Sequence, residues 1–215
     1  ASMRRYAEEV LWPNGFEVEY IECGPDTVTD TALVKAAFDG AAEILVFDPV
    51  DTRLWKRLED ASRALEVHVP IKKLTNPNFY LTSKDIEHFF NGKSKYKFSD
   101  FYQWQRERFN ILIDDSYRPF GGKWSFDSEN RQKLPKDIEL PGIRSYGDNQ
   151  YVAEAVTYIE SKFPSNPGSL TSFIWPTNHQ EAKEWLYAFF EQRLRDFGPY
   201  EDAIDPKAVW LFHSA

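Results

Sequence analysis

The feature that most limits the fold of this chain is a short apolar run that ends at an aspartate and a proline. Ile44–Phe47 are four consecutive apolar residues, and Asp48 and Pro49 follow them directly. A short continuous apolar run that is bounded by turn residues is typical of a strand buried on both faces of a parallel sheet. The sequence therefore predicts a fully buried strand at this position.

The segments around this strand alternate between strand and helix patterns. Residues 16–23 alternate apolar and acidic side chains, as in a strand with one exposed face, and residues 32–40 have helical character. Apolar residues recur at helical spacing within 54–65, and residues 66–71 return to a strand pattern. This βαβαβ order predicts an α/β fold with a Rossmann-like open parallel sheet and crossover helices.

The middle of the chain changes to helical patterns and then to a long loop. Thr82 and Asp85 have the spacing of a capping box, and apolar residues between Phe98 and Ile113 share one face of a second helix. The segment 114–149 is rich in Gly and Pro and has little periodicity. A loop of this length predicts either a linker or a functional segment.

The two ends of the sequence suggest that it is part of a longer protein. It starts inside a predicted helix, residues 2–10, whereas a parallel α/β unit normally opens with a strand, so we expect the first strand to be missing. The apolar run 209–212 near the other end should pack against something. We expect these residues to be disordered or shielded by a neighbouring molecule, and burial inside this chain would count against truncation.

Two further helices are predicted before that run. One covers residues 151–163, and the other begins near Asn178, with Glu181 placed for a capping interaction. The second helix should continue to Leu194 and end at the Gly198–Pro199 pair, because Gly and Pro commonly follow a helix end.

The composition excludes several classes of site. Cys23 is the single cysteine, which excludes a disulfide framework and any cysteine-held cluster within the chain and favours a reducing intracellular compartment. The four histidines are scattered, so no metal site is predicted, and His68 and His88 are interpreted as structural. No nucleophile or catalytic pair stands out. Without an apolar run that could cross a bilayer or a secretory signal, the chain is predicted to be cytoplasmic, with no membrane partner.

The charge of the chain is unevenly distributed. The net charge is −8, but residues 71–150 carry 14 basic and 11 acidic side chains, an excess of three positive charges. Distant charges are screened beyond about 10 Å at moderate salt, so a phosphate backbone would respond to this local excess. An ordinary solvated surface explains the same distribution, and both interpretations stay open.

Three stretches together resemble one family, the photolyase-related flavoproteins of bacteria, which include the iron–sulfur (6-4) photolyases and their cryptochrome relatives. The first combines residues 2–10 and 16–23, the second combines 106–114 with the sequence GGKWSFDSENR at 121–131, and the third runs from 197 to 214. The 121–131 sequence is the most specific of them. The resemblance is collinear over nearly the whole chain.

The resemblance implies a division into three regions. Residues 1–80 correspond to an α/β antenna-type domain, 81–148 to helices and a long interdomain loop, and 149–215 to the start of a truncated, all-α FAD-binding domain. It implies a fragment of a light-dependent DNA repair photolyase, which repairs (6-4) photoproducts in damaged DNA by electron transfer from reduced flavin. The fragment itself is expected to be inactive, because most of the flavin domain is absent.

The implied cofactors belong to the longer protein. These are FAD, a lumazine-type antenna pigment and a 4Fe–4S cluster, and none is expected to be bound to this fragment. Two alternatives remain: a fragment of a cryptochrome-like blue-light photoreceptor, or a small nucleotide-binding α/β module without light chemistry. The sequence sets no oligomeric state.

The family resemblance also points to candidate site residues. Lysine and arginine can meet phosphates, glycines permit close approach, and aromatic rings can stack where a damaged base leaves the duplex. The candidate DNA contacts are Gly121, Gly122, Lys123, Trp124, Phe126, Asn130 and Arg131. In the alternative reading, the two aromatic residues join two domains while Asn130 and Arg131 tie down the loop by hydrogen bonds.

Two smaller sets of residues correspond to cofactor sites. Tyr200, His213 and Ser214 match positions that begin the flavin pocket, although His213 is equally explained as a flexible terminal residue. Met3, Asp48 and Pro49 border the ligand crevice expected for the antenna pigment. Met3 could instead be part of the core, and Asp48–Pro49 could be a turn that ends the strand.

Overall fold

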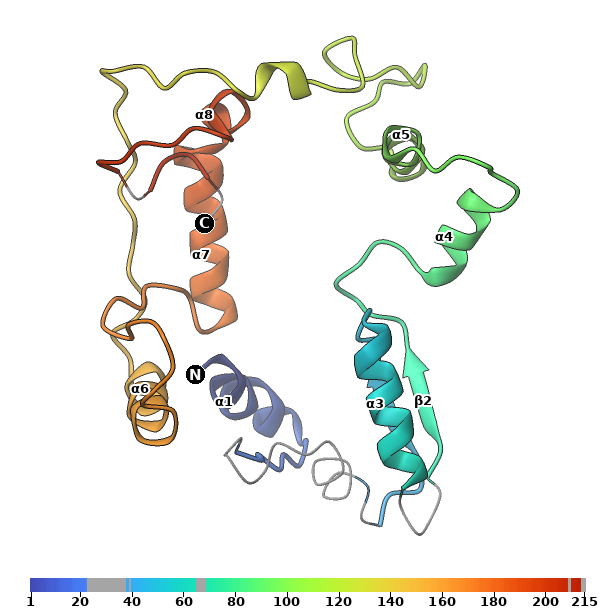
Figure 1. Cartoon of the computed structure of the whole chain (residues 1–215), viewed down its shortest axis with the longest axis vertical. Coiled ribbons are helices and arrows are strands. Elements are labelled where there is room, and N and C mark those ends of the chain that lie inside the picture. The colour runs from blue at the N-terminus through green and yellow to red at the C-terminus, as the bar shows by residue number, and fades with distance from the viewer. Residues whose placement is uncertain (23–37, 39, 65–68, 209, 214–215) are drawn as a thin grey trace. The chain divides into compact units, whose positions relative to one another are not determined.

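The computed structural model describes residues 1–22, 38, 40–64, 69–208 and 210–213 (Figure 1). The chain divides into two compact units: unit 1 comprises Ala1–Tyr20 and Gly121–Ala215, and unit 2 comprises Ile21–Phe120. The first 20 residues thus belong with the second half of the chain. The sequence instead suggested three continuous regions, 1–80, 81–148 and 149–215. That division stays a prediction.

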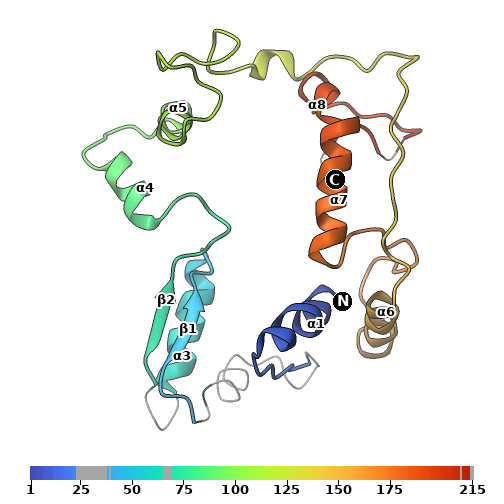
Figure 2. The same cartoon turned by 180° about the vertical axis from the view of Figure 1, so that it is seen from behind.

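Unit 2 contains a βαβ motif. Strand β1 (Ile44–Phe47) pairs in parallel with β2 (Ile71–Leu74), and helix α3 (Thr52–Arg63) connects them (Figure 2). Helix α3 begins where the Asp51 carboxylate accepts hydrogen bonds from the backbone N–H groups of the next turn. The small core consists of Phe38 and Ala61, against which Ile44, Leu58 and Ile71 pack. The mixed helix and sheet content confirms the α/β class.

Only one face of β1 is covered in the described structure. Ile44 and Val46 are partly buried, whereas Leu45 and Phe47 are 56% and 57% exposed. The prediction of a strand buried on both faces was therefore wrong. The continuous apolar run predicted the strand correctly. It could not show whether other elements would cover one face of that strand or both.

Two predicted strands differ from the structure. β2 begins at Ile71 and not at residue 66: residues 66–68 lie outside the described part, and Val69 and Pro70 precede the strand. Residues 16–22 form no strand and are mostly exposed, while Cys23 lies outside the described residues. Alternation of apolar and polar side chains suits a strand, but a strand also needs a neighbour to pair with. The predicted helix at 32–40 lies outside the described residues, apart from Phe38 and Gly40.

Helices α4 (Ser83–Phe90) and α5 (Phe98–Phe109) complete unit 2. The capping box is confirmed, because Thr82 Oγ1 accepts from the Asp85 N–H and the Asp85 carboxylate accepts from the Thr82 N–H. α5 is confirmed but ends earlier than predicted, at Asn110, whose φ of +53° is left-handed. The Arg106 guanidinium then donates to the carbonyls of Ile111 and Leu112, which hold a non-helical turn.

Unit 1 begins with helix α1 (Ser2–Tyr6), which continues through a π-helical turn at Ala7–Leu11. Helices α6 (Gln150–Lys162) and α7 (His179–Gln192) confirm the two later predictions, and asparagines 149 and 178 cap their N-termini. The predicted end at Gly198–Pro199 was wrong. α7 ends at Gln192. Gly198 and Pro199 lie inside a separate helix, α8 (Leu194–Tyr200).

The long segment before α6 is irregular. Between Gly121 and Asn149 the regular element is a short 3-10 turn at Asp127–Glu129. The absence of periodicity in the sequence therefore corresponds to an extended connection, and its role as an interdomain linker stays a prediction.

The C-terminal apolar run folds into unit 1. Leu211 and Phe212 are only 3% and 2% exposed, and the Phe212 ring lies 5.8 Å from the Tyr200 ring. Trp210 makes an edge contact with Trp175, at 6.5 Å between ring centroids. The prediction that this run would be disordered or shielded by a neighbouring molecule was wrong for these three residues, and Val209 lies outside the described part.

Candidate functional site

The loop 121–131, which holds the candidate DNA contacts, begins with two glycines in left-handed conformation. Gly121 and Gly122 have φ angles of +80° and +78°. A Cβ atom at Gly121 would lie 2.6 Å from Cζ of Phe126, whereas one at Gly122 would meet nothing within 4 Å. The first glycine is thus needed both for its φ angle and for the approach of the Phe126 ring.

Lys123 lies over that ring. Its Nζ is 4.6 Å from the Phe126 ring centroid and forms an ion pair with the Glu129 carboxylate. Both charged side chains are about half-exposed. Exposed ion pairs contribute about 0–1 kcal/mol, so a phosphate can replace the carboxylate at little cost. Trp124, next in sequence, is half-buried.

The end of the loop is attached to the segment after α8. Arg131 Nε donates to Asp202 Oδ2 at 3.1 Å, and Asn130 Nδ2 donates to Glu201 Oε2 at 3.3 Å. The Gln132 N–H donates to the Pro199 carbonyl at 3.0 Å. These bonds support the alternative reading for Asn130 and Arg131, in which they fix the loop, whereas the contacts of Lys123 to Glu129 and Phe126 lie within the loop.

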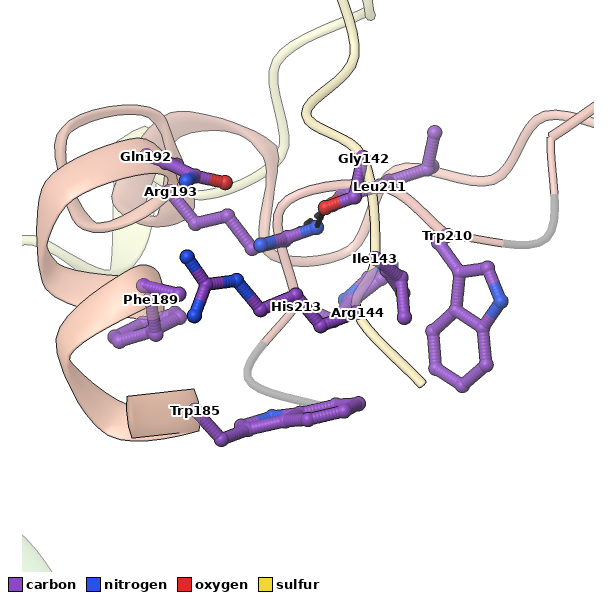
Figure 3. A pocket seen from close by; sticks show the side chains of 11 residues that line it. Gly142, Ile143, Arg144, Trp185, Phe189, Gln192, Arg193, Trp210, Leu211 and His213 are labelled. Carbon is purple, nitrogen blue, oxygen red and sulfur yellow. Dashed lines mark hydrogen bonds between the residues drawn. The ribbon is translucent and has the colours of Figure 1, made fainter. Parts of the chain in front are cut away.

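The flavin candidates Tyr200 and His213 lie near the C-terminal run, and Ser214 lies outside the described residues. Tyr200 packs on Phe212, and His213 borders a cavity of about 30 Å³ (Figure 3). The other residues around this cavity come from the connection before α6, from α7 and from the C-terminal run: Gly142, Ile143, Arg144, Trp185, Ala188, Phe189, Gln192, Arg193, Trp210 and Leu211.

Arg193 is the buried cation of this cavity. It is 8% exposed, and its guanidinium donates to the carbonyls of Pro141, Gly142 and Leu211 at 2.8 to 3.3 Å. Figure 3 shows Arg193 beside Gly142 and Leu211. Burial lowers the pKa of the Arg193 guanidinium, because the charged form has lost solvent. Three carbonyl oxygens replace that solvent. Through these bonds Arg193 connects the segment before α6 to the C-terminal run.

The cavity does not fit a flavin. Pockets that enclose ligands of that kind have volumes of about 300–1,000 Å³, far above the volume beside His213. The cavity beside His213, which Tyr200 does not line, therefore holds no flavin by itself, and the assignment of Tyr200, His213 and Ser214 to a flavin pocket stays a prediction.

The antenna candidates belong to different units, and each has its own surroundings. Asp48 follows β1, and its carboxylate accepts from the Val50 N–H at 2.9 Å and lies 3.8 Å from Lys73 Nζ. The Asp48 carbonyl accepts from Asn76 Nδ2 at 2.8 Å, and Pro49 is half-buried beside it. These contacts favour the reading of Asp48–Pro49 as a turn that ends the strand.

Met3 lies in unit 1 and is 72% exposed, so it is not a core residue. It borders a groove of about 570 Å³ between the first helical segment and the N-terminus of α7. The groove is mostly apolar and is lined by Ser2, Met3, Tyr6, Glu9, Val10, Pro176, Thr177, Asn178, His179 and Gln180. Its volume falls in the range of small-molecule sites.

A charged network joins the two elements that border this groove, and one of its members, Thr177, lines the groove. Arg5 donates to Glu181 Oε1 at 2.6 Å and to Thr177 Oγ1 at 2.7 Å, and Glu181 Oε2 accepts from the Thr177 N–H at 2.9 Å. Burial alone would raise the pKa of Glu181, but the bonds from Thr177 and Arg5 outweigh it and hold that pKa below its ordinary value. The network fixes α1 to the start of α7.

Sequence reasoning missed the residues with the most extensive long-range contacts. Arg5 bonds to Glu181, 176 residues away, and Arg193 bonds to the Pro141 carbonyl, 52 residues away. The sequence around either arginine does not predict such a distant partner. His88, interpreted as structural, is exposed and contacts the Trp104 ring at 6.4 Å. Within the described ranges, His, Cys, Asp and Glu side chains form no group of three that could hold a metal ion. None of the described helices is both long and apolar enough to cross a membrane.

Comparison with known proteins gives the chain its relatives. It is 28% identical over 218 aligned positions to a (6-4) photolyase of Agrobacterium fabrum, an alignment that covers 100% of this chain and 42% of that protein. It is 29% identical over 138 positions to an uncharacterized protein of Acanthamoeba polyphaga mimivirus, covering 62% of this chain and 68% of that protein. The chain thus spans less than half the length of the photolyase that it matches.

A family model described as deoxyribodipyrimidine photo-lyase-related protein matches residues 1–175, which include α1, the βαβ motif, the 121–131 loop and α6. The resemblance inferred from the sequence is therefore confirmed, and the chain belongs to the family of deoxyribodipyrimidine photo-lyase-related proteins.

Proposed function

We propose that this chain is the N-terminal part of a light-dependent DNA repair protein that acts on (6-4) photoproducts. The observation that carries the proposal is the match of the whole chain to a (6-4) photolyase, together with family membership over residues 1–175. In this proposal the βαβ motif belongs to a Rossmann-like antenna-type domain, and the connection before α6 is the interdomain linker. Flavin, antenna pigment and cluster belong to the full-length protein, and this chain alone does not catalyse repair. The single cysteine favours a cytoplasmic location.

The part assigned to this chain is DNA contact through the loop 121–131. Lys123 is half-exposed, and its bond to Glu129 can be exchanged for one to a phosphate. Gly122 leaves the backbone open to close approach, because it carries no Cβ atom and nothing lies within 4 Å of that position, whereas the Phe126 ring occupies this space at Gly121. Phe126, 44% exposed, offers a ring that could stack on a displaced base.

The test uses the full-length protein. Flavin absorption in the purified protein, and light-dependent loss of (6-4) photoproducts from irradiated DNA, are the expected results. Bound flavin without repair would overturn the repair assignment in favour of a cryptochrome-like photoreceptor. A colourless, well-folded protein would overturn both in favour of a nucleotide-binding module.

The loop is tested by Lys123→Ala in the same protein. Removal of one phosphate contact should weaken DNA binding and reduce the slope of log affinity against log salt by about one. Lys207→Ala is the matched control, since Lys207 is also exposed and its side chain forms no bond among the described residues. Equal affinities and slopes for wild type and Lys123→Ala would contradict the loop's role and leave the repair assay unaffected.

A further inference from the structure

The connection between α4 and α5, whose course Figure 1 shows, is basic and aromatic, and each of its residues is exposed. Lysines occupy alternate positions 93, 95 and 97, with Tyr96 between the last two and Phe98 directly after. Tyr96 is 72% exposed and Phe98 is 79% exposed. Other rings of this chain, such as Tyr80, are equally exposed, so exposure alone does not mark a site; this loop differs because its two rings stand among three lysines.

The positive charge of this loop is not neutralised locally. Among the residues that the structure describes, neither Lys95 nor Lys97 forms an ion pair or a side-chain hydrogen bond. Four acidic side chains belong to the helix pair: Asp85, Glu87, Asp100 and Glu107. None of them pairs with Lys95 or Lys97, and two have other partners. Asp85 is paired with Arg108 at 2.7 Å, and Glu107 accepts from Gln103 at 2.8 Å. The loop therefore presents its charges to an anion from outside the described chain.

An aromatic cluster under the loop holds it in place. The Tyr96 ring contacts Phe90 edge-on at 5.0 Å, and Phe90 stacks on Phe101 at 5.3 Å. Lys93 Nζ lies 3.2 Å from the Phe89 ring centroid. One edge of Tyr96 is thus fixed while most of the ring stays accessible, which lowers the entropy lost when another flat group stacks on it.

We propose that the loop 91–98 binds the phosphodiester backbone of nucleic acid, with Lys95 and Lys97 at phosphates and Tyr96 stacked on an unpaired base. Positive side chains interleaved with exposed rings are typical of surfaces that bind single strands. Anionic lipid surfaces usually attract clusters of about four to eight basic residues, more than this loop carries. The site lies in unit 2, outside the loop 121–131, and the proposal does not depend on light-driven repair.

The experiment measures binding of the whole chain to an undamaged oligonucleotide, as a single strand and as a duplex, over a range of salt concentrations. Lys95→Ala/Lys97→Ala should bind both several-fold more weakly. The slope of log affinity against log salt should fall by about 1.8 for the duplex and about 1.4 for the single strand. Tyr96→Ala should weaken single-strand binding on the order of tenfold and leave duplex binding nearly unchanged.

Lys56→Ala/Lys72→Ala is the matched control, because both lysines are exposed in unit 2 and form no side-chain bond among the described residues. The proposal is overturned by an unchanged slope in the loop variant, or by an equal loss in the control. Binding to anionic vesicles without binding to either oligonucleotide overturns it in favour of a lipid surface. Since neither Lys95 nor Lys97 forms an ion pair or a side-chain hydrogen bond among the described residues, thermal unfolding of the loop variant should match that of wild type.

Discussion

At the scale of single residues, Gly121 is the position where the loop 121–131 is most tightly constrained. Gly121→Ala must adopt a φ of +80° and place its Cβ 2.6 Å from Phe126 Cζ. The left-handed backbone conformation should lower the free energy of unfolding of this variant by about 1–2 kcal/mol. Displacement of the Phe126 ring should lower it further. Urea denaturation measures the total.

The matched control is Gly122→Ala, which has nearly the same φ and meets nothing within 4 Å. Its free energy of unfolding should fall only by the amount that the left-handed backbone conformation costs. In a Phe126→Ala background the two glycine variants should become equally destabilised, because the ring that distinguishes them is gone. A persistent difference in that background would show that the Phe126 contact is not the cause.

A second residue-scale prediction concerns Gly147. A Cβ at this position would lie 1.9 Å from the backbone oxygen of Phe173, and a backbone cannot turn aside as a side chain can. Gly147→Ala should lower the free energy of unfolding by about 1–3 kcal/mol, as in other overpacked sites. Gly142→Ala should change it little, since no atom lies within 4 Å of that Cβ and the Gly142 carbonyl still accepts from Arg193.

At the scale of elements, the start of α4 depends on a reciprocal cap. Thr82→Ala removes the acceptor of the Asp85 N–H and should cost about 1 kcal/mol of stability. Bonds from the backbone and side chain of Thr82, and the charge of Arg108, lower the pKa of Asp85. That contribution is present above the ordinary Asp pKa and is lost as the pH falls through the lowered one. NMR titration should show the Asp85 pKa rising in Thr82→Ala, and an unchanged pKa would contradict the cap.

Elements that depend on neighbouring residues in sequence were predicted well. The caps at Thr82 and Asn178 act within one helical turn, so their spacing in the sequence is sufficient. The strand expected at 16–23 failed in its described part because pairing needs a partner that a local pattern cannot supply. The early end of α5 at Asn110 was missed because apolar spacing continues beyond it, to the buried Ile113.

The candidate site was only partly predictable for the same reason. The sequence singled out the Gly121–Gly122 pair and Lys123, whose contacts lie within the loop itself. It could not show that Arg131 bonds to Asp202, or that Met3 borders a groove with the start of α7. Such contacts join residues far apart in sequence.

At the scale of unit 1 as a whole, the bond between Arg5 and Glu181 fixes α1 to α7. Both side chains are largely buried, so Arg5→Ala should lower the free energy of unfolding by about 1–3 kcal/mol. Because the pKa of Glu181 is lowered in the folded state, this contribution exists above its ordinary value of 4.5 and is lost as the pH falls through the lowered pKa. Urea denaturation at neutral and at strongly acidic pH should show the difference between wild type and variant shrinking.

Arg131→Ala serves as the control for this prediction. Its pair with Asp202 is exposed, with side-chain exposures of 74% and 53%, and such pairs contribute less than about 1 kcal/mol. An effect of Arg5→Ala no greater than that of Arg131→Ala would argue against a structural role for the network.

The bond from Arg5 to Glu181 also determines when the first helix can reach its folded position during synthesis on the ribosome. Arg5 is made before its partners Thr177 and Glu181, which follow it by more than 170 residues. At about 5–20 residues per second, the first helix waits roughly 10–30 s for its partners. Unit 2 is one continuous stretch and emerges completely during that wait. It can therefore fold while the opening segment is still exposed to chaperones and proteases.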